Sequence, residues 1–406
     1  MASSDNPIEL DDPSGVAPPD ATRGVTTESG VEPAPLPRRA FAYVGGWKSD
    51  AAARWTFIWP SVIVVLFLSI FPLFASLTLA FGKLVFQKGK VDVSFVGISN
   101  FTTLLFGTER THLLGLARTP TPLGWLVLIV VAVLLVRALV GSLRSGRVGV
   151  RGAIARVAGA LFGIGLTWLI AQTMLSDGGR PGSLVVTLFY VFAGIAVTYG
   201  LGLGLAILAV QPLPGRRFFR IVFLLPLTIT PIGVGYMFRM MTDTGKGPLA
   251  PLFGALGATG YTWVTDPWAA RIAVVIGDAW QWTPFVFIVL LAALEGLDVE
   301  VREAAFVDGA SKWQTFSHIT WPAILPVSVT IVLIRMIEGF KIVDMPNILT
   351  GGGPGTATQS LTLDAYLNWR ALNLGSSAAI AYILLILVTV IASAYVAWTR
   401  RWVQAY

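Results

Sequence analysis

The sequence predicts an all-helical integral membrane protein with about eight transmembrane helices. Of the 406 residues, 55% are hydrophobic and 13% are charged, whereas soluble globular chains carry about 25% charged residues. The mean hydropathy is +0.72. The apolar residues gather in eight runs, each near the length of about 20 residues that crosses a bilayer as a helix. This composition excludes a soluble globular chain.

The first 45 residues differ in composition from the rest. They are rich in Pro, Ser and acidic residues and have few large apolar side chains. Such a segment buries too little surface to offset the entropy of ordering the chain. We therefore expect residues 1–45 to be a disordered N-terminal tail, either merely solvated or regulatory. A basic stretch followed directly by an apolar core is missing, so no secretory signal is predicted.

The apolar runs give the expected order of the spans. They lie at about 55–81, 123–141, 153–175, 184–210, 218–238, 269–294, 323–340 and 378–399. Lys and Arg in short loops accumulate on the cytoplasmic side. If both termini are cytoplasmic, three basic clusters fall on that side: Arg144, Arg147 and Arg151; Arg216, Arg217 and Arg220; Arg400 and Arg401. The loop at 82–122, with five basic residues, then falls outside, against the rule.

A polar island at 303–326, EAAFVDGASKWQTFSHITWPAILP, separates the sixth and seventh runs. Glu303 is expected to open a short helix. Asp308-Gly309 is a turn signal because Gly accepts positive φ. A second helix should follow, because apolar residues recur at helical spacing. The next span should then begin near the two prolines, because proline is tolerated best in the first turn of a helix. These residues are Trp313, Phe316, Ile319, Pro322 and Pro326.

The island resembles the coupling loop of ABC importer permeases, whose pattern is E-A-A, three residues, G, nine residues and I-x-L-P. The matching residues are Glu303, Ala304, Ala305, Gly309, Ile319 and Pro322, with Trp321 in place of Leu. The resemblance implies docking in a groove of a cytoplasmic ATPase, and the alternative is an ordinary amphipathic loop. The expected coupling residues are Glu303, Ala304, Ala305, Asp308, Gly309, Ala310, Ile319 and Pro322.

Further stretches resemble carbohydrate-type ABC permeases. They are IFPLFASLTLAFGK, FVGISNF, GLGLGLAILA and RIVFLLPLTITPIGVGYMF. The resemblance covers 55–105 and 184–400 and omits the second and third runs. It implies four parts: the tail 1–45, a first transmembrane helix with its external loop at 46–122, an inserted helix pair at 123–181, and a permease core at 182–406.

The stretch at 349–366, LTGGGPGTATQSLTLDAY, resembles the external glycine-rich loop of sugar importers of the maltose and glycerol-phosphate type. The resemblance implies that a soluble sugar-binding protein docks at Gly351, Gly352, Gly353 and Pro354. These glycines are not followed by the Lys of a phosphate-binding P-loop, and no such motif occurs in the chain. ATP and Mg²⁺ are therefore expected on partner ATPase subunits, with no cofactor on this chain.

Polar residues inside spans are costly and are functional candidates by default. An acid, an amide and an indole at Asp278, Gln281 and Trp282 suit a sugar, which offers hydroxyls and flat ring faces. The alternative is that these groups pair with a neighbouring helix. Arg335 and Glu338, three apart, share a helix face and are expected to be able to form an ion pair. Another reading makes Glu338 and Lys341 a structural pair at the external edge.

The maltose-type permeases imply a substrate site on the fifth, sixth and seventh spans. The matching positions are Leu227, Pro231, Asp278, Gln281, Trp282, Arg335, Gly339 and Ile342. Several of them are apolar here, so the sugar's identity and the subunit that holds it stay open. No metal site is expected, because there is no cysteine and His112 and His318 lie far apart. The net charge of +7 fits basic cytoplasmic edges and not nucleic-acid binding.

The sequence therefore predicts a permease subunit, without enzymatic activity of its own, of a binding-protein-dependent ABC importer in the bacterial cytoplasmic membrane. Its expected cargo is an oligosaccharide or glycoside. Its expected partners are a second homologous permease, an ABC ATPase dimer, a periplasmic or lipid-anchored sugar-binding protein and membrane lipid. A secondary transporter or channel driven by an ion gradient, and a scaffold that only recruits a cytoplasmic partner, are the alternatives.

Overall fold

The computed structural model describes residues 50–87, 90–144, 150–212, 214–257 and 263–403. The predicted disordered tail lies outside these residues, as does Arg147. The chain divides into two compact units, Met1–Leu68 and Ser69–Tyr406. The first unit contains helix α1 (Asp50–Val65), in which the rings of Trp55 and Trp59 meet at a tilt with centroids 6.1 Å apart. The π-helix η1 (Leu66–Ile70) crosses into the second unit.

The second unit begins with α2 (Phe71–Ala80), followed by a β-hairpin of β1 (Gly82–Gln87) and β2 (Lys90–Phe95). Two short helices follow, α3 (Ser99–Leu105) and α4 (Arg110–Leu113). The hairpin was not predicted, although residues 91–95 alternate between apolar and polar side chains, the period of a strand. Asn100 fixes the hairpin to α2 by donating hydrogen bonds to the carbonyls of Ala80 and Gly82.

The expected inserted pair consists of α5 (Pro122–Arg144) and α6 (Val150–Thr173), which pack against each other. A two-stranded sheet of β3 (Gly115–Leu116) and β4 (Arg180–Pro181) closes the pair where it leaves the rest of the chain. The Thr121 amide and hydroxyl both donate to the Leu175 carbonyl. The two ends of this segment are therefore held together.

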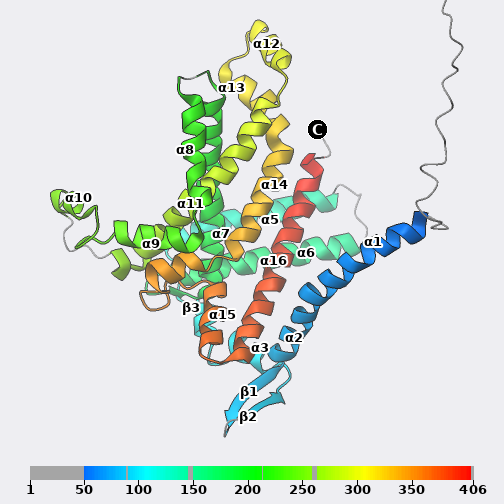
Figure 1. Ribbon diagram of the computed structural model, residues 1–406, viewed down its shortest axis with the longest axis vertical. Helices are drawn as coiled ribbons and strands as arrows, with labels where there is room; N and C mark the ends of the chain where they lie inside the picture. Colours follow the sequence, from blue (N-terminus) through cyan, green and yellow to red (C-terminus); the bar gives the residue numbers. More distant parts are fainter. Residues whose placement is uncertain (1–49, 88–89, 145–149, 213, 258–262, 404–406) are drawn as a thin grey trace, which may run out of the picture. The chain divides into compact units, whose positions relative to one another are not determined.

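Helix α7 (Ser183–Val210) is the centre of the second unit, because it packs along both α11 (Pro267–Glu295) and α14 (Trp321–Phe340). The C-terminal helix α16 (Leu374–Val403) packs on α14 and α2. Figure 1 shows α7, α11 and α14 beside one another. Much of α11 is buried inside the chain, unlike α5 and α6, which suits it to carry internal polar residues.

The fifth apolar run forms two helices, α8 (Arg216–Thr228) and α9 (Pro231–Met241), bent by 100° with respect to each other. A span at about 218–238 was predicted, and the structure shows that this run is broken by a sharp bend. The cause is Pro231, which disfavours helical dihedrals at the residue before it. Thr230 accordingly adopts an extended conformation, and its side chain accepts the Gly233 amide and caps α9.

Seven helices of the described residues are long and apolar enough to cross a membrane, or up to eight if the bent pair is one span. The prediction of about eight spans is thereby confirmed. The candidate spans are Phe57–Ala80, Pro122–Arg144, Gly152–Thr173, Ser183–Val210, Pro267–Glu295, Lys312–Phe340 and Leu374–Arg400.

The connections between spans carry short helices. After α9 come α10 (Ala250–Ala255) and the 3-10 helix η2 (Trp263–Thr265). After α11 come α12 (Val299–Val307), α13 (Lys312–Thr315) and the π-helix η3 (Phe316–Thr320). After α14 come the π-helix η4 (Pro346–Thr350) and α15 (Leu361–Arg370). In Figure 1, α12 and α13 lie at one end of the second unit, and α15 and the hairpin at the other.

Candidate functional site

The polar island forms a helical elbow, residues 299–320, between α11 and α14. Gly309 has a φ of +77°, which Gly adopts without strain, and it reverses the chain between α12 and α13. Ser311 and Gln314 form a reciprocal cap at the start of α13, each side chain bonding the other's backbone amide. The predicted helix-turn-helix is thus present. Glu303, however, does not open the first helix, which starts at Val299, and α13, η3 and α14 form one continuous run, Lys312–Phe340.

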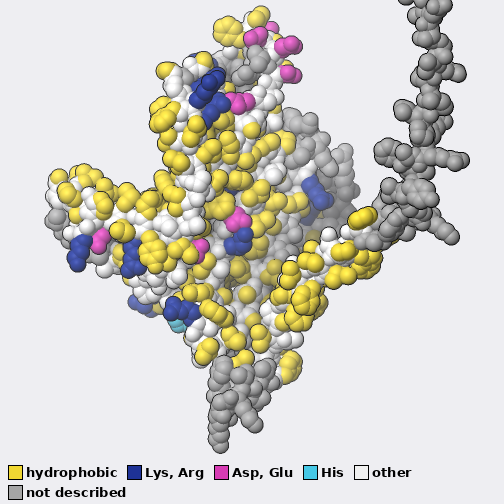
Figure 2. Space-filling view, in the orientation of Figure 1, with side chains coloured by type: hydrophobic (Ala, Val, Ile, Leu, Met, Phe, Trp, Pro, Cys, Tyr) yellow, Lys and Arg dark blue, Asp and Glu magenta, His cyan; other side chains and the backbone are white. Residues whose placement is uncertain are grey.

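The elbow exposes large apolar side chains. Phe306, Val307 and Trp313 are 81%, 83% and 73% exposed. Trp313 stacks on Phe316 with centroids 5.7 Å apart, so its ring is held in place. The acidic residues Glu300, Glu303 and Asp308 are exposed as well, and Figure 2 shows acidic side chains gathered at this end of the second unit.

The predicted coupling residues lie on two faces of the elbow. Asp308, Gly309, Ala310 and Ile319 line one hollow together with Gln314, Thr315 and His318. Glu303 and Ala304 are exposed on α12, whereas Ala305 is buried and Pro322 is half-buried at the start of α14. The structure therefore brings half of the predicted residues to a single concave surface.

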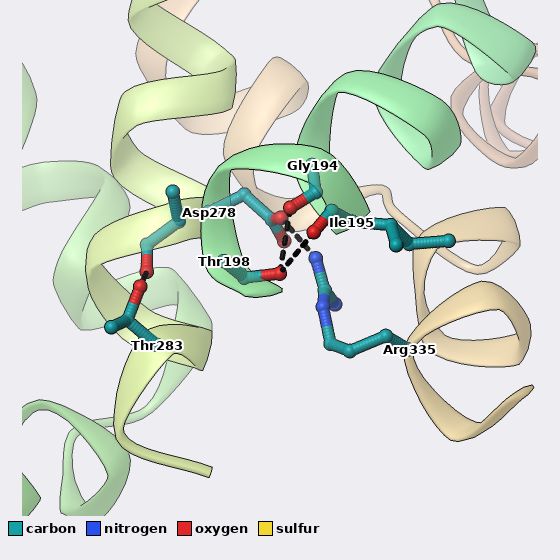
Figure 3. A network of polar contacts seen from close by, with 7 residues as sticks. Gly194, Ile195, Thr198, Asp278, Thr283 and Arg335 are labelled. Atoms are coloured by element: carbon teal, nitrogen blue, oxygen red, sulfur yellow. Dashed lines mark hydrogen bonds and ion pairs between the residues drawn. The ribbon is translucent and has the colours of Figure 1, made fainter. Parts of the chain in front are cut away.

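A buried polar centre joins α7, α11 and α14. Asp278 Oδ2 accepts a hydrogen bond from Arg335 Nη2 at 2.5 Å, and both residues are less than 10% exposed. Figure 3 shows the two side chains reaching toward each other beside the turn of α7 that contains Gly194 and Thr198. A Cβ on Gly194 would come within 3.1 Å of Asp278 Oδ2. The missing side chain at Gly194 thus makes room for the pair.

This geometry corrects the expected pair of Arg335 and Glu338. Arg335 binds Asp278 because both are buried, where an unpaired charge is costly. Glu338 instead binds Lys341 Nζ at 2.6 Å, at the exposed end of α14. The Trp282 ring lies 5.0 Å from the Arg335 guanidinium carbon, a cation–π contact. Two nitrogens of Arg335, Nε and Nη1, are buried without a hydrogen-bond partner among the described residues.

Gln281 connects the polar centre to the break between α8 and α9, because its Nε2 donates to the Ile229 carbonyl at 3.2 Å. Two predicted substrate positions, Leu227 and Pro231, flank that break and are exposed. Gly339, one turn beyond Arg335 on α14, packs against Val191 of α7, and Ile342 packs in the cluster around Val186 and Tyr190.

The glycine-rich loop lies near the end of α11 that is farthest from the elbow. Gly351 and Gly352 adopt φ of +64° and +86°, which permits the tight turn after η4. Arg271 of α11 donates to the Ala357 carbonyl at 2.7 Å, and Tyr190 of α7 donates to the Thr358 carbonyl at 3.1 Å. The loop is thus held by α7 and α11 on one side, while Gly351 is exposed.

Sequence reasoning missed several residues that the structure makes important. Thr230 caps α9 at the break, and the T-P pair at 230–231 was an available signal. Tyr199 of α7 and Ser328 of α14 bond through their hydroxyls at 2.6 Å, for which the sequence offered no signal. Within the described ranges, no group of three or more His, Cys, Asp or Glu residues could hold a metal ion.

A chain of many apolar spans with a water-exposed elbow between two inner helices is the architecture of a membrane permease subunit. Residues 196–404 match the family described as "Binding-protein-dependent transport system inner membrane component". The chain belongs to this family of ABC importer permeases and is a multi-pass inner membrane protein. It is a transporter component and not an enzyme, as predicted.

Two relatives illustrate the similarity. The chain is 32% identical to the trehalose/maltose permease MalF of Thermococcus litoralis over 51% of this chain and 70% of the relative. It is 30% identical to the sn-glycerol-3-phosphate permease UgpA of Agrobacterium fabrum over 53% and 74%. The fold is similar to a chain of a bacterial ABC transporter that imports the acidic polysaccharide alginate, with a TM-score of 0.60 and 17% identity over 86% of this chain and 95% of that chain.

Proposed function

We propose that the chain is one of two membrane subunits of an importer for an oligosaccharide or glycoside, driven by ATP that partner subunits hydrolyse. The names of relatives support a sugar: one is a trehalose/maltose permease, and another is the trehalose permease SugA of Mycobacterium tuberculosis, 31% identical over 55% of this chain and 72% of the relative. Because another relative is an sn-glycerol-3-phosphate permease, a polyol phosphate is the alternative cargo.

The observation that carries the proposal is the exposed apolar surface of the elbow. Phe306 and Val307 stand on α12, outside the candidate spans, and Trp313 stands in the first turn of the run Lys312–Phe340. Exposed apolar clusters mark protein- or membrane-binding surfaces, and the exposed acidic residues Glu300, Glu303 and Asp308 favour a protein partner here. We assign the surface to a cytoplasmic ATPase whose groove accepts the three side chains and carries basic residues opposite Glu300 and Glu303. An ATPase dimer would bind ATP and Mg²⁺ and offer one groove to each membrane subunit.

The break at 229–230 is assigned to the translocation pathway. Non-helical backbone at membrane depth is tolerated only where protein buries it or water reaches it. Leu227, Thr228 and Thr230 are exposed in this chain, so the second permease and a water-filled path between the two would cover them. Sugar hydroxyls could bond to the freed carbonyls and threonine hydroxyls there, and to Gln281 and Trp282 beside them.

The proposal also fixes an orientation. With the elbow in the cytoplasm, the basic residues at the start of α8 and the end of α16 lie on the same side, which the positive-inside rule favours. Both termini are then cytoplasmic. The glycine-rich loop is outside, where a soluble binding protein would deliver the sugar to Gly351 and its neighbours.

The test is reconstitution with the second permease, the ATPase and the binding protein. Trp313→Asp and Phe306→Asp should abolish co-purification of the ATPase and ATP-driven sugar uptake into proteoliposomes, because each places a charge in an apolar groove. Leu256→Asp serves as the control, since Leu256 is 72% exposed beside α10, away from the elbow, and its replacement should change neither reading.

The same experiment separates the alternatives. Uptake that follows an ion gradient and ignores ATP would favour a secondary transporter. An absence of any uptake, with the ATPase still bound, would favour a scaffold. Wild-type ATPase binding by both elbow variants would remove the assignment of the elbow.

A further inference from the structure

Arg220 occupies a position that neither the family pattern nor the proposed pathway explains. It lies one turn into α8, and its Nη2 donates to Glu295 Oε1 at 2.5 Å and to the Ala209 carbonyl at 2.9 Å. Ala209 is the penultimate residue of α7, and Glu295 is the last residue of α11. One guanidinium from a third helix therefore holds the C-terminal ends of two spans.

The chemistry of the three groups explains why they meet. The last four carbonyls of a helix lack partners within the helix, and they give its C-terminus a partial negative charge. Glu295 adds a full negative charge at the end of α11, where the helix dipole disfavours it. Arg220 offsets both effects, because its guanidinium donates to both acceptors from Nη2, and its planar, rigid geometry holds the direction of these bonds better than a flexible lysine ammonium would.

Stability alone is a poor reason for this contact. The Arg220 and Glu295 side chains are 26% and 46% exposed, and exposed ion pairs contribute little to stability because water and salt screen them. The position of the contact in the chain is a better reason. Glu295 lies just ahead of α12, separated from it only by residues 296–298, so the contact is made at the root of the elbow.

The other end of the elbow, where α14 begins, is also held to α7. Trp321 begins α14 and packs edge-on against Tyr199 of α7, with ring centroids 6.4 Å apart. The Tyr199 hydroxyl bonds Ser328 Oγ one to two turns further along α14. Leu297 and Trp321 pack on a shared core that includes Phe287. Both ends of the elbow are thus fixed to α7, one by a hydroxyl pair and one by Arg220.

We propose that Arg220 is a positioning residue for energy coupling. It transmits displacement of the elbow from Glu295 into α8, and α8 ends at the break assigned to the pathway. Without it, α8 would follow α11 through apolar packing alone, such as the edge-on contact of Phe223 with Phe287. The proposal rests on the proposed function, since it requires an ATPase at the elbow.

The experiment uses the full complex of both permeases, the ATPase and the binding protein in proteoliposomes. Arg220→Gln and Glu295→Gln, singly and together, are compared for ATPase co-purification and for sugar taken up per ATP hydrolysed. Arg217→Gln is the matched control, because Arg217 is exposed on the same helix and makes no hydrogen bond or ion pair within the described part of the chain.

Arg220→Gln should keep the ATPase bound and lower uptake per ATP by about fivefold or more, the lower end of typical coupling between sites. Arg220→Lys should recover only part of the loss. The double variant should be no worse than Arg220→Gln, because both changes break one interaction. Arg217→Gln should behave as wild type.

Wild-type uptake per ATP in assembled Arg220→Gln or Glu295→Gln would overturn the proposal. So would failure of both to assemble, which would show that the pair is only structural, or an equal loss in Arg217→Gln. If the wild-type chain itself bound no ATPase, the proposed function would fail. That result differs from failure of the Arg220 proposal, in which the wild-type chain still binds the ATPase.

Discussion

Each charged residue that is buried in the described part of the chain has a specific partner. Asp278 and Arg335 pair inside the helix bundle, while Arg271 donates to the Ala357 carbonyl. Removing one member of such a pair leaves an uncompensated charge and typically costs about 3–5 kcal/mol. Asp278 and Arg335 Nη2 are therefore committed to each other, whereas Nε and Nη1 of Arg335 have no hydrogen-bond partner among the described residues.

Asp364 is the buried acid outside the spans. Its carboxylate accepts hydrogen bonds from Ser183 Oγ at 2.9 Å, Gln359 Nε2 at 3.2 Å and Asn368 Nδ2 at 3.1 Å. Burial raises the pKa of Asp364, and the Ser183 hydrogen bond only partly offsets this; His112 lowers it and Glu109 raises it by their charges. The contact fixes α15 to the start of α7, so protonation of Asp364 affects how α15 is held.

The raised pKa predicts a pH dependence. The folded chain binds this proton more tightly than the unfolded chain, so the resulting stability is complete below the ordinary pKa of 3.8 and is lost as pH rises through the raised pKa. Asp364→Asn lacks this dependence. The melting temperature of wild type minus that of Asp364→Asn, measured in detergent, should therefore rise as pH falls from about 7 toward the ordinary Asp pKa. A difference that stays constant or falls would contradict the assignment.

At the scale of elements, α7 organises the core because small residues let other helices approach it. A Cβ on Gly202 would come 2.6 Å from Val286 Cγ1 and 3.1 Å from the Phe287 amide nitrogen of α11. Membrane helices gain little from burying apolar surface, since lipid is equally apolar, so close packing at small residues matters more. The approach at Gly202 is therefore a main determinant of the α7–α11 contact.

Gly202→Ala should lower the stability of the purified chain by about 1–3 kcal/mol, the usual cost of overpacking. Gly200→Ala and Gly204→Ala are matched controls on the same helix, since an added Cβ at either position meets nothing within 4 Å. They should match wild type or be slightly more stable, because Ala favours helix. Thermal unfolding of the three variants in one detergent provides the comparison, and equal melting temperatures would refute the packing argument.

At the scale of the whole molecule, the segment that contains α5 and α6, which we predict to be an insertion, has its two ends in contact. A Cβ on Gly115 would come 2.6 Å from the Gly182 amide nitrogen, and one on Gly182 would come 2.5 Å from the Gly115 amide nitrogen. Helix α6 packs on the core through Leu166, Leu169 and Ile170. Because lipid can replace those apolar contacts, we predict that the permease core does not depend on the pair of α5 and α6.

Removal of residues 116–181, with Gly115 joined to Gly182 through a short Gly linker, should therefore give a folded chain that still binds the ATPase. Size-exclusion chromatography in detergent and co-purification measure the two properties. Aggregation of the shortened chain with every linker length would show that the pair belongs to the core. A shortened chain that folds and transports would leave the pair a role other than forming the pathway.

The sequence by itself predicted about eight spans and the presence of the elbow, because lipid demands long apolar helices and a polar segment between them is conspicuous. The turn at Gly309 was predicted from the Asp-Gly pair, which is a local signal because Gly accepts positive φ. Only the tertiary structure decided which charges pair, that the fifth run bends at Thr230, and that Arg220 meets Glu295 across 75 residues. Those outcomes depend on which helix faces pack together, and spacing along one helix cannot determine a partner on another.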